Sequence, residues 1–188
     1  YQWYFTNMTN PITGATNNTY TISSVGTSNT GQYYYCKASN SCGNVTTTGI
    51  YLGLKTASAI TSQPVDAAVC SGSSNIFTVG VSGTPSPSIQ WYRNNTAVGT
   101  NNPTNFSYST ILAGNYYCTV SNTCGSVQSN VAALVLNTVP ALSSQSSNDT
   151  VCAGLAKTLS ITCSGTNPIT YQWYFTNMTN PITGATNN

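Results

Sequence analysis

The sequence predicts an all-β protein that consists of tandem β-sandwiches, and three observations support this fold class. Apolar and polar residues alternate over short segments, clusters of Gly, Pro, Asn and Ser interrupt the chain about every ten residues, and no segment has a helical period. Short strands separated by frequent turns, without helices, are typical of sandwich domains of about 100 residues.

An internal repeat sets the domain organisation. Residues 171–188 read YQWYFTNMTNPITGATNN, as do residues 1–18, so Tyr1 recurs as Tyr171 and the period is 171 − 1 = 170. Trp3, Trp91 and Trp173 divide this period into two unequal intervals, 91 − 3 = 88 and 173 − 91 = 82. We therefore expect two homologous domains in each 170-residue repeat.

The individual strands follow from the alternation of apolar residues. In one strand Phe77, Val79 and Val81 point the same way, and Ile89 and Trp91 continue the pattern in the next. Four further groups of alternating apolar residues each predict a strand. They are Leu159, Ile161 and Cys163; Tyr20, Ile22 and Val25; Tyr34 and Cys36; and Tyr116 and Cys118. The segments SGTPSPS, NNTAVGTNNPTN and SGTNPIT between them are predicted turns, because Gly, Pro and Asn set or tolerate tight dihedrals.

Charge is scarce, which limits the classes of partner. Charged residues make up 3% of the chain, against about 25% in an ordinary soluble protein, and the formal net charge is +2. A basic surface for nucleic acid or for anionic membranes is therefore not expected. No apolar run approaches the length of a membrane-spanning helix, which is about 20 residues. Tyr1 begins within a strand-like segment, so we expect any export signal to lie elsewhere.

The cysteines indicate an oxidising environment. The chain has seven Cys and no His, and thiolate-only zinc sites usually show paired CxxC motifs, so disulfides are favoured over zinc. An extracellular or cell-surface location follows from disulfides.

Catalysis is not expected, since a general acid, a general base or an activated nucleophile is required. The chain has no His and no Glu, and its two carboxylates, Asp66 and Asp149, lie near the starts of different domains. A calcium site between domains is less favoured, because such sites gather several carboxylates. We expect no cofactor and no metal.

The order of key residues resembles the immunoglobulin pattern. Cys163, Trp173 and then Tyr34 and Cys36 of the repeated copy match a strand-B Cys, a strand-C Trp and a strand-F Tyr two residues before a second Cys. The resemblance implies that residues 1–57 hold strands C to G of domain 1, residues 58–138 a complete domain 2, and residues 139–188 strands A to C of the next domain 1. It implies a core that contains Trp3, Trp91, Trp173, Tyr34 and Tyr116.

A narrower resemblance covers the whole chain. The segments VCSGSSNIFTVGVSG, QWY and GNYYCTVSNTCGSVQSNVAALVL are similar to the immunoglobulin-like repeats of large Bacteroidota surface proteins, including gliding-motility-type adhesins. This resemblance implies a role in adhesion at the cell surface. In Asp149-Thr150-Val151 it also implies an O-glycosylation motif of exported Bacteroidota proteins, with Thr150 as the acceptor.

The disulfide scheme is implied by these resemblances. The cysteine of VCxG near the domain start is tied to that of SNxCG near its end, which implies a bridge between Cys70 and Cys124. The equivalent pair, Cys152 with Cys42, and the core pair, Cys163 with Cys36, would each join neighbouring copies. Val81 occupies the place of Cys163 in domain 2. Cys118 is therefore expected to be a buried free thiol.

The two incomplete domains admit two explanations. Either one long polypeptide continues through many repeats, or separate subunits complete each other by strand complementation. In the second case two copies of the same eighteen residues would compete for one strand-C position, so we favour the continuous chain.

The expected function is a non-enzymatic structural repeat of an extracellular filament or giant adhesin, with adjacent copies as partners. With so little charge to protect its sheet edges, we expect neighbouring domains or glycans to cover them. The alternative is a module that binds glycans or protein through an exposed face of Tyr33, Tyr35 and Tyr117. Ordinary pairing on the sheet surface is the favoured explanation of these tyrosines.

Overall fold

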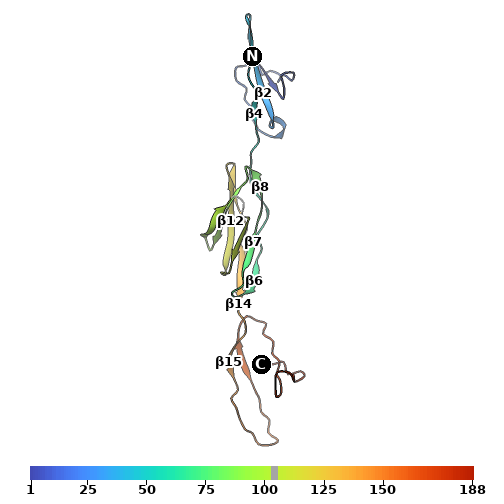
Figure 1. Cartoon of the computed structure of the whole chain (residues 1–188), viewed down its shortest axis with the longest axis vertical. Helices are drawn as coiled ribbons and strands as arrows, with labels where there is room; N and C mark the ends of the chain where they lie inside the picture. The colour runs from blue at the N-terminus through green and yellow to red at the C-terminus, as the bar shows by residue number, and fades with distance from the viewer. Residues whose placement is uncertain (103–105) are drawn as a thin grey trace.

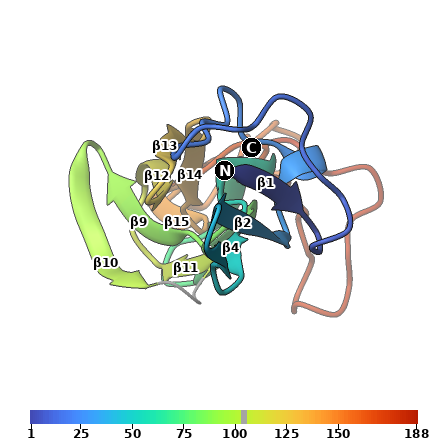
Figure 2. The ribbon, with the colours of Figure 1, turned by 90° about the horizontal axis from the view of Figure 1, so that it is seen from above.

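The computed structural model describes residues 1–102 and 106–188, which form three units arranged end to end (Figure 1). The view along the long axis shows the units one behind another (Figure 2). No α-helix occurs among the described residues, and the single helical turn there is the 3-10 helix η1, Thr27–Asn29. No helix in the described part of the chain is long and apolar enough to span a membrane.

The middle unit is a two-layered sandwich. Its strands are β5 (Thr56–Ser62), β6 (Ala67–Cys70), β7 (Asn75–Thr78), β8 (Gly80–Thr84), β9 (Ser88–Arg93), β10 (Thr96–Asn102), β11 (Ser107–Thr110), β12 (Gly114–Asn122), β13 (Gly125–Gln128) and β14 (Ala132–Asn137). One sheet has the order β10-β9-β12-β14-β6, with β13 paired to β12, and the pairs β11-β7 and β5-β8 complete the unit. The β14-β6 pair is parallel, and the other pairs are antiparallel.

The core lies between these strands. Its buried residues are Phe77, Val79, Ile89, Trp91, Tyr116, Cys118, Val120, Ala132 and Leu134. The rings of Phe77 and Tyr116 have centroids 4.8 Å apart, and those of Phe77 and Trp91 are 6.2 Å apart. The predicted alternation in β9 and β12 is therefore confirmed, because every second residue points into this core.

One predicted turn is wrong in part. The segment NNTAVGTNNPTN, residues 94–105, contains β10, which pairs with β9 after a two-residue turn of Asn94 and Asn95. Both asparagines have positive φ, 48° and 66°, as type I′ hairpin turns require. The last three residues of the segment lie outside the described residues.

The first unit is a single sheet of β1 (Gln2–Phe5), β2 (Gln32–Asn40), β3 (Gly43–Thr46) and β4 (Ile50–Leu52). The predicted strand at Tyr20, Ile22 and Val25 does not form, and this stretch is irregular. In the middle unit the corresponding strand, β11, pairs with β7. The described first unit has no counterpart of β7, so the segment has no strand to bond to.

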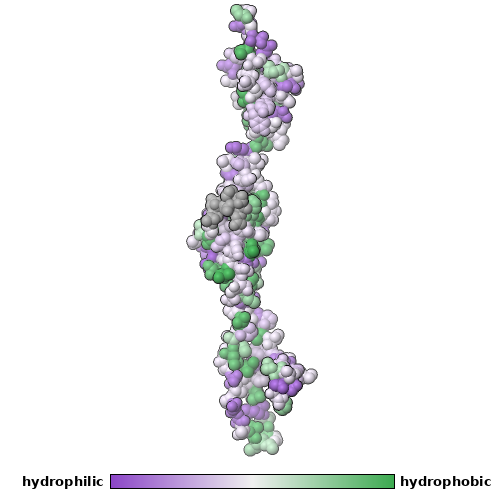
Figure 3. Space-filling view, in the orientation of Figure 1, coloured by the Kyte–Doolittle hydropathy of each residue, from purple (hydrophilic) through white to green (hydrophobic). Residues whose placement is uncertain are grey.

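The third unit contains β15 (Ala141–Gln145) and β16 (Ile161–Ser164). Its register repeats that of the middle unit, because Leu142 pairs with Cys163 where Ile60 pairs with Val81. Hydrophobic side chains are exposed over this unit (Figure 3), including Leu159 at 56% and Phe175 at 70% exposure. The alternation predicted a strand through Leu159, Ile161 and Cys163, but β16 begins at Ile161 and Leu159 precedes it.

The duplicated segment folds alike in the first and third units. The indole N–H of Trp3 donates to the Asn17 carbonyl at 3.0 Å, and that of Trp173 donates to the Asn187 carbonyl at 2.8 Å. Isolated bridges join Tyr4 to Pro11 and Tyr174 to Pro181 in the same way. The local sequence therefore determines this structure even where the surrounding strands differ.

Candidate functional site: cysteine turns and tyrosine faces

The seven cysteines are free thiols in this structure. Cys36 and Cys118 are buried, and Cys163 is half-buried. The remaining four are exposed, and they are Cys42, Cys70, Cys124 and Cys152.

Cys118 lies in the core of the middle unit, opposite Trp91 in the β12-β9 pair. Burial raises the pKa of its thiol, and a hydrogen bond with Ser129 opposes this effect. Val81 packs against the same core. It pairs with Ile60 in the middle unit as Cys163 pairs with Leu142 in the third unit. An apolar residue therefore stands where a bridging partner of Cys118 would be.

Cys70 and Cys124 do not approach each other, contrary to the bridge expected within one sandwich. Cys70 pairs with Asn137 at the end of β14, and β14 pairs with the start of β12 through Leu134 and Gly114. Cys124 follows the other end of β12. Nine strand residues span about 26 Å at about 3.3 Å per step. Disulfides require Cα atoms within about 7 Å, so this fold cannot bridge the two.

The exposed cysteines occupy two kinds of turn. Cys42 and Cys124 lie in matching turns after β2 and β12, in which their N–H groups donate to Asn40 and Asn122 Oδ1, both at 2.9 Å. Cys70 and Cys152 lie in a second kind of turn. The carbonyl of Cys70 accepts from the Ser73 N–H at 2.9 Å, and that of Cys152 from the Leu155 N–H at 3.2 Å.

Outward-facing tyrosines gather on the first unit. Tyr33 and Tyr35 on β2 have ring centroids 6.5 Å apart, and Tyr33 lies 5.3 Å from Tyr51 on β4. Tyr4 on β1 is the strand partner of Tyr35. A side chain at Gly49 would come within 2.8 Å of the Tyr33 ring, so this glycine lets the rings lie over the strand edge.

Tyr117 belongs to a separate face, on the middle unit. Its ring stacks on that of Tyr92 with centroids 5.0 Å apart and an interplanar angle of 8°. Tyr33 and Tyr35 thus lie on the first unit and Tyr117 on the middle unit, as their places in the two predicted domains imply. Sequence reasoning missed Tyr51 and Tyr92, although each is an aromatic residue at an outward strand position.

Two inward tyrosines join adjacent loops to the sheets. The Tyr34 hydroxyl donates to the Asn29 carbonyl at 2.8 Å. Burial raises the pKa of Tyr34, and the neighbouring Tyr20 adds a smaller effect in the same direction. The Tyr116 hydroxyl donates to the Leu112 carbonyl at 2.6 Å. Trp91 is buried like these two tyrosines, whereas Trp3 and Trp173 are half-buried.

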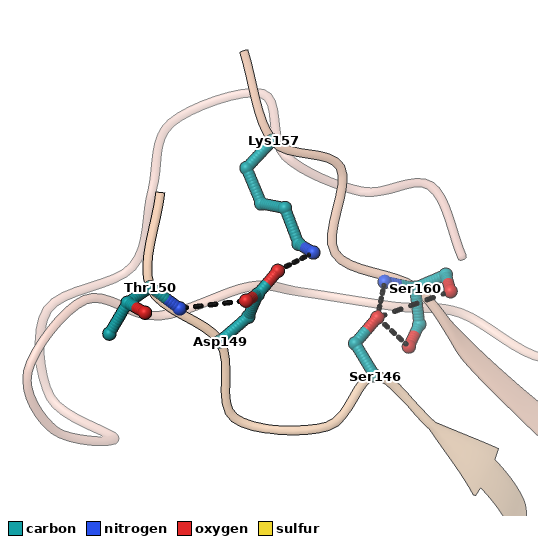
Figure 4. Close-up of polar contacts among 5 residues, drawn as sticks. All are labelled: Ser146, Asp149, Thr150, Lys157 and Ser160. Atoms are coloured by element: carbon teal, nitrogen blue, oxygen red, sulfur yellow. Dashed lines mark hydrogen bonds and ion pairs between the residues drawn. The ribbon is translucent and has the colours of Figure 1, made fainter. Parts of the chain in front are cut away.

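Thr150 lies in an exposed loop of the third unit (Figure 4). Asp149 accepts a hydrogen bond from the Thr150 backbone N–H at 2.8 Å and pairs with Lys157. The Lys157 contact, with a smaller contribution from Thr150, lowers the Asp149 pKa. Thr150 enters these contacts through its backbone alone.

The two carboxylates have structural contacts in different units. Asp66 accepts the Ala133 N–H at 2.8 Å, which joins the segment before β6 to β14. Among the described residues there is no group of three Cys, Asp, Glu or His able to hold a metal ion.

Comparison with known proteins identifies the fold of the middle unit. Residues 56–136 match the family model for the immunoglobulin domain. No curated protein matches the sequence.

Solved structures extend this likeness along the chain. Two three-domain immunoglobulin fragments of titin, one from the I-band and one a Glu-to-Ala variant, are each 17% identical with a TM-score of 0.66, over 98% of this chain and 70% of the fragment. The first five immunoglobulin domains of Sidekick-1 are 28% identical over 73% of this chain, with a TM-score of 0.44, and this chain spans 33% of that fragment. The fold class is therefore tandem immunoglobulin-like β-sandwiches.

Proposed function

We propose that the chain is a structural repeat of an extracellular filament or giant cell-surface adhesin, in which immunoglobulin-like sandwiches act as spacers. One observation carries the proposal. The duplicated eighteen-residue segment adopts the same local structure in the first and third of three units arranged end to end. A following copy of residues 19–57 would then continue the third unit as it continues the first.

The two outer units offer complementary surfaces for such completion. A hollow of about 260 Å³ on the first unit is lined by residues that include Trp3, Cys36 and Thr47. In the middle unit the corresponding face of β9 and β12 is covered by Phe77 and Val79. The third unit supplies Leu159, the counterpart of Phe77, and this apolar side chain is exposed. The core bridge of Cys36 with Cys163 of the adjoining copy belongs to this arrangement.

Mass under reducing and denaturing conditions tests the continuous chain. We expect native material to migrate far above the mass of a single 188-residue chain, because the copies are joined by peptide bonds. A discrete band at the mass of one chain would show separate subunits instead. Low-magnification electron micrographs should show filaments of constant width if the repeats also pack laterally, and thin flexible tethers if they do not.

A second candidate function is binding of glycans or protein by the tyrosine face. Tyr33, Tyr35 and Tyr51 present adjacent rings on the outer side of the first unit, and Tyr4 is the strand partner of Tyr35. Aromatic rings of this kind stack on the apolar faces of sugars. A glycan array probed with the 188-residue chain tests this role, with Tyr33→Ser together with Tyr51→Ser as the loss variant and Tyr117→Ser as the control. Specific binding that only the loss variant abolishes would favour this function.

We also propose that Thr150 carries an O-glycan, which would cover part of a surface that has little charge. Its position in an exposed loop supports this proposal. Intact mass spectrometry of native material should show an excess over the sequence mass that Thr150→Ala removes. An unchanged mass would exclude the modification.

A further inference from the structure

We infer that disulfides cross the junctions between consecutive sandwiches, joining Cys70 to the counterpart of Cys42 in the following unit and Cys124 to the counterpart of Cys152 in the preceding unit. This inference deepens the proposed function and rests on its end-to-end arrangement of repeats. Its basis is that the two kinds of cysteine turn lie at opposite ends of the middle unit, which contains both.

The turn of Cys70 is fixed at the end of the middle unit that faces the third unit. The N–H of Ser71 donates to the carbonyl of Asn137 at 2.7 Å. Asn137 is the last residue of β14, and the connector to the third unit begins at Thr138. Cys70 is exposed there.

The turn of Cys124 is fixed at the opposite end, which faces the first unit. The side-chain amide of Asn122 donates to the Thr56 carbonyl at 2.8 Å and to the Pro85 carbonyl at 3.0 Å. Thr56 begins β5, directly after the connector from the first unit. Cys124 is exposed at this junction.

When equivalent positions of successive units are compared, the residues that anchor the two turns are neighbours on one connector. Equivalent residues of successive units are 82 apart from β2 and β12 onward, as the pairs Gln32 with Leu52 and Gly114 with Leu134 show. Thr56 therefore corresponds to Thr138, which follows Asn137. At one junction the second kind of turn is held by one carbonyl and the first kind by the carbonyl of the next residue, about 3.3 Å farther along an extended chain.

Each cysteine lies within two residues of its anchoring residue. Cys70 precedes Ser71, and Cys124 comes two residues after Asn122. Turns held this closely can bring their Cα atoms within about 7 Å, the separation that a disulfide spans. Asn40 holds Cys42 in the same turn as Asn122 holds Cys124, so the next unit would present the counterpart of Cys42 to Cys70.

The far end of the third unit repeats this geometry. Cys152 lies in the loop of residues 146–160, which points away from the middle unit (Figure 1). Gly72 and Gly154, two residues after Cys70 and Cys152, have φ of 89° and 88°. Every exposed cysteine thus obtains one partner in an adjacent unit, the following one for Cys70 and Cys152 and the preceding one for Cys42 and Cys124, and none is used twice.

The bond forms by oxidation of two thiols. Each cysteine loses its proton, the two sulfurs lose two electrons together, and an S–S bond forms. The electrons and protons pass to the disulfide form of a dithiol oxidoreductase, whose own S–S bond breaks to give two thiols. Extracytoplasmic compartments supply oxidants of this class.

Peptide mapping of native material tests the pairing. Free thiols are alkylated first, and digestion with pepsin in acid then prevents exchange. We expect one linked pair that joins AAVCSG to SNSCGN and another that joins SNTCGS to DTVCAG, and the four sequences are distinguishable. Linkage of AAVCSG to SNTCGS, or alkylation of all four cysteines, would overturn the inference.

Single substitutions give an independent test within the tandem protein. Cys70→Ser should leave the Cys42 counterpart free, raising its alkylation from background to near completion without affecting Cys124. Cys124→Ser should expose Cys152 in the same way. Cys118→Ala is the control and should release neither. If Cys70→Ser instead exposes Cys124, the bridge lies within one sandwich and the inference is wrong.

Failure of the proposed function would look different. Peptide linkage reports which cysteines pair, whereas mass under reducing conditions reports whether copies share one polypeptide. Separate subunits joined by these bridges would give the expected linked peptides together with a ladder that collapses on reduction.

Discussion

Tyr116 shows how one side chain ties a loop to the sandwich core. Its ring is fully buried, its hydroxyl donates to the Leu112 carbonyl at 2.6 Å, and it lies 3.0 Å from the Thr110 hydroxyl. Removal of the phenolic oxygen would take away the bond to the Leu112 carbonyl and the contact with the Thr110 hydroxyl, which would keep only its bond from the Leu112 N–H.

Tyr116→Phe should therefore lower the free energy of unfolding by about 1–3 kcal/mol, the range for a buried polar group that loses its partner. Urea denaturation followed by tryptophan fluorescence measures this change. Tyr117→Phe is the matched control, because its ring faces outward and stacks on Tyr92. A shift of similar size in both variants would contradict the assigned role of the hydroxyl.

Cys118 should make stability depend on alkaline pH. Burial raises its pKa in the folded state, so the folded protein holds this proton more tightly than the unfolded chain. The stabilisation is complete below the unfolded thiol pKa, about 8.5, and is lost as pH rises through the folded value. Denaturation midpoints measured across this range should decline in the parent and less in Cys118→Ala. Equal declines would exclude Cys118 as the source.

At the scale of elements, the turn after β12 is held against the start of the middle unit, beside the connector. Asn122 donates to the Thr56 and Pro85 carbonyls and accepts the Cys124 N–H. Asn40 holds the equivalent turn of the first unit by bonds to Cys42 and Gly43 only.

Asn122→Ala should accordingly loosen the chain at the end of the connector, since the two bonds that hold the turn to Thr56 and Pro85 are lost. In the 188-residue chain we expect amide hydrogen exchange at residues 55–58 to become faster, by about tenfold for each 1.4 kcal/mol lost. Asn40→Ala should leave these amides unchanged. Equal protection in both variants would mean that the side chain does not fix the junction.

The sequence alone predicted much of the sandwich core, because burial follows the alternation of residues such as Ile89, Trp91 and Cys118. The prediction failed where a strand needs a partner strand from a distant part of the sequence, as at Tyr20 and Ile22. It also failed for Cys70 and Cys124, since sequence spacing does not reveal which end of a sandwich a turn occupies. The parallel β14-β6 pair, which places Cys70, is a long-range contact that local patterns do not encode.

At the scale of the molecule, the core is concentrated in one unit. All residues of the buried cluster belong to the middle sandwich. Residues 56–138 should therefore unfold cooperatively when expressed alone, whereas residues 1–57 should not. Circular dichroism during heating compares them, and a cooperative transition in residues 1–57 would contradict the complementary-half interpretation.

The scarcity of charge should make the molecule indifferent to salt. The described residues contain one ion pair, Lys157 with Asp149, and it is exposed. Exposed pairs contribute little and are screened by salt. We expect the Tm of the middle sandwich to change by less than about 2 °C between about 0.05 M and about 0.5 M NaCl. A larger shift would reveal electrostatic interactions that these contacts do not account for.

The shared local structure of the duplicated segment has a genetic consequence. Recombination between the two coding copies removes or adds one whole period, and the joined product keeps the same residues on both sides of every junction. Such an event changes the number of sandwiches without creating a new interface that must evolve. Length variants that differ by whole multiples of this period should therefore fold as well as their parent. Selection can then change the length of the array through the number of repeats alone.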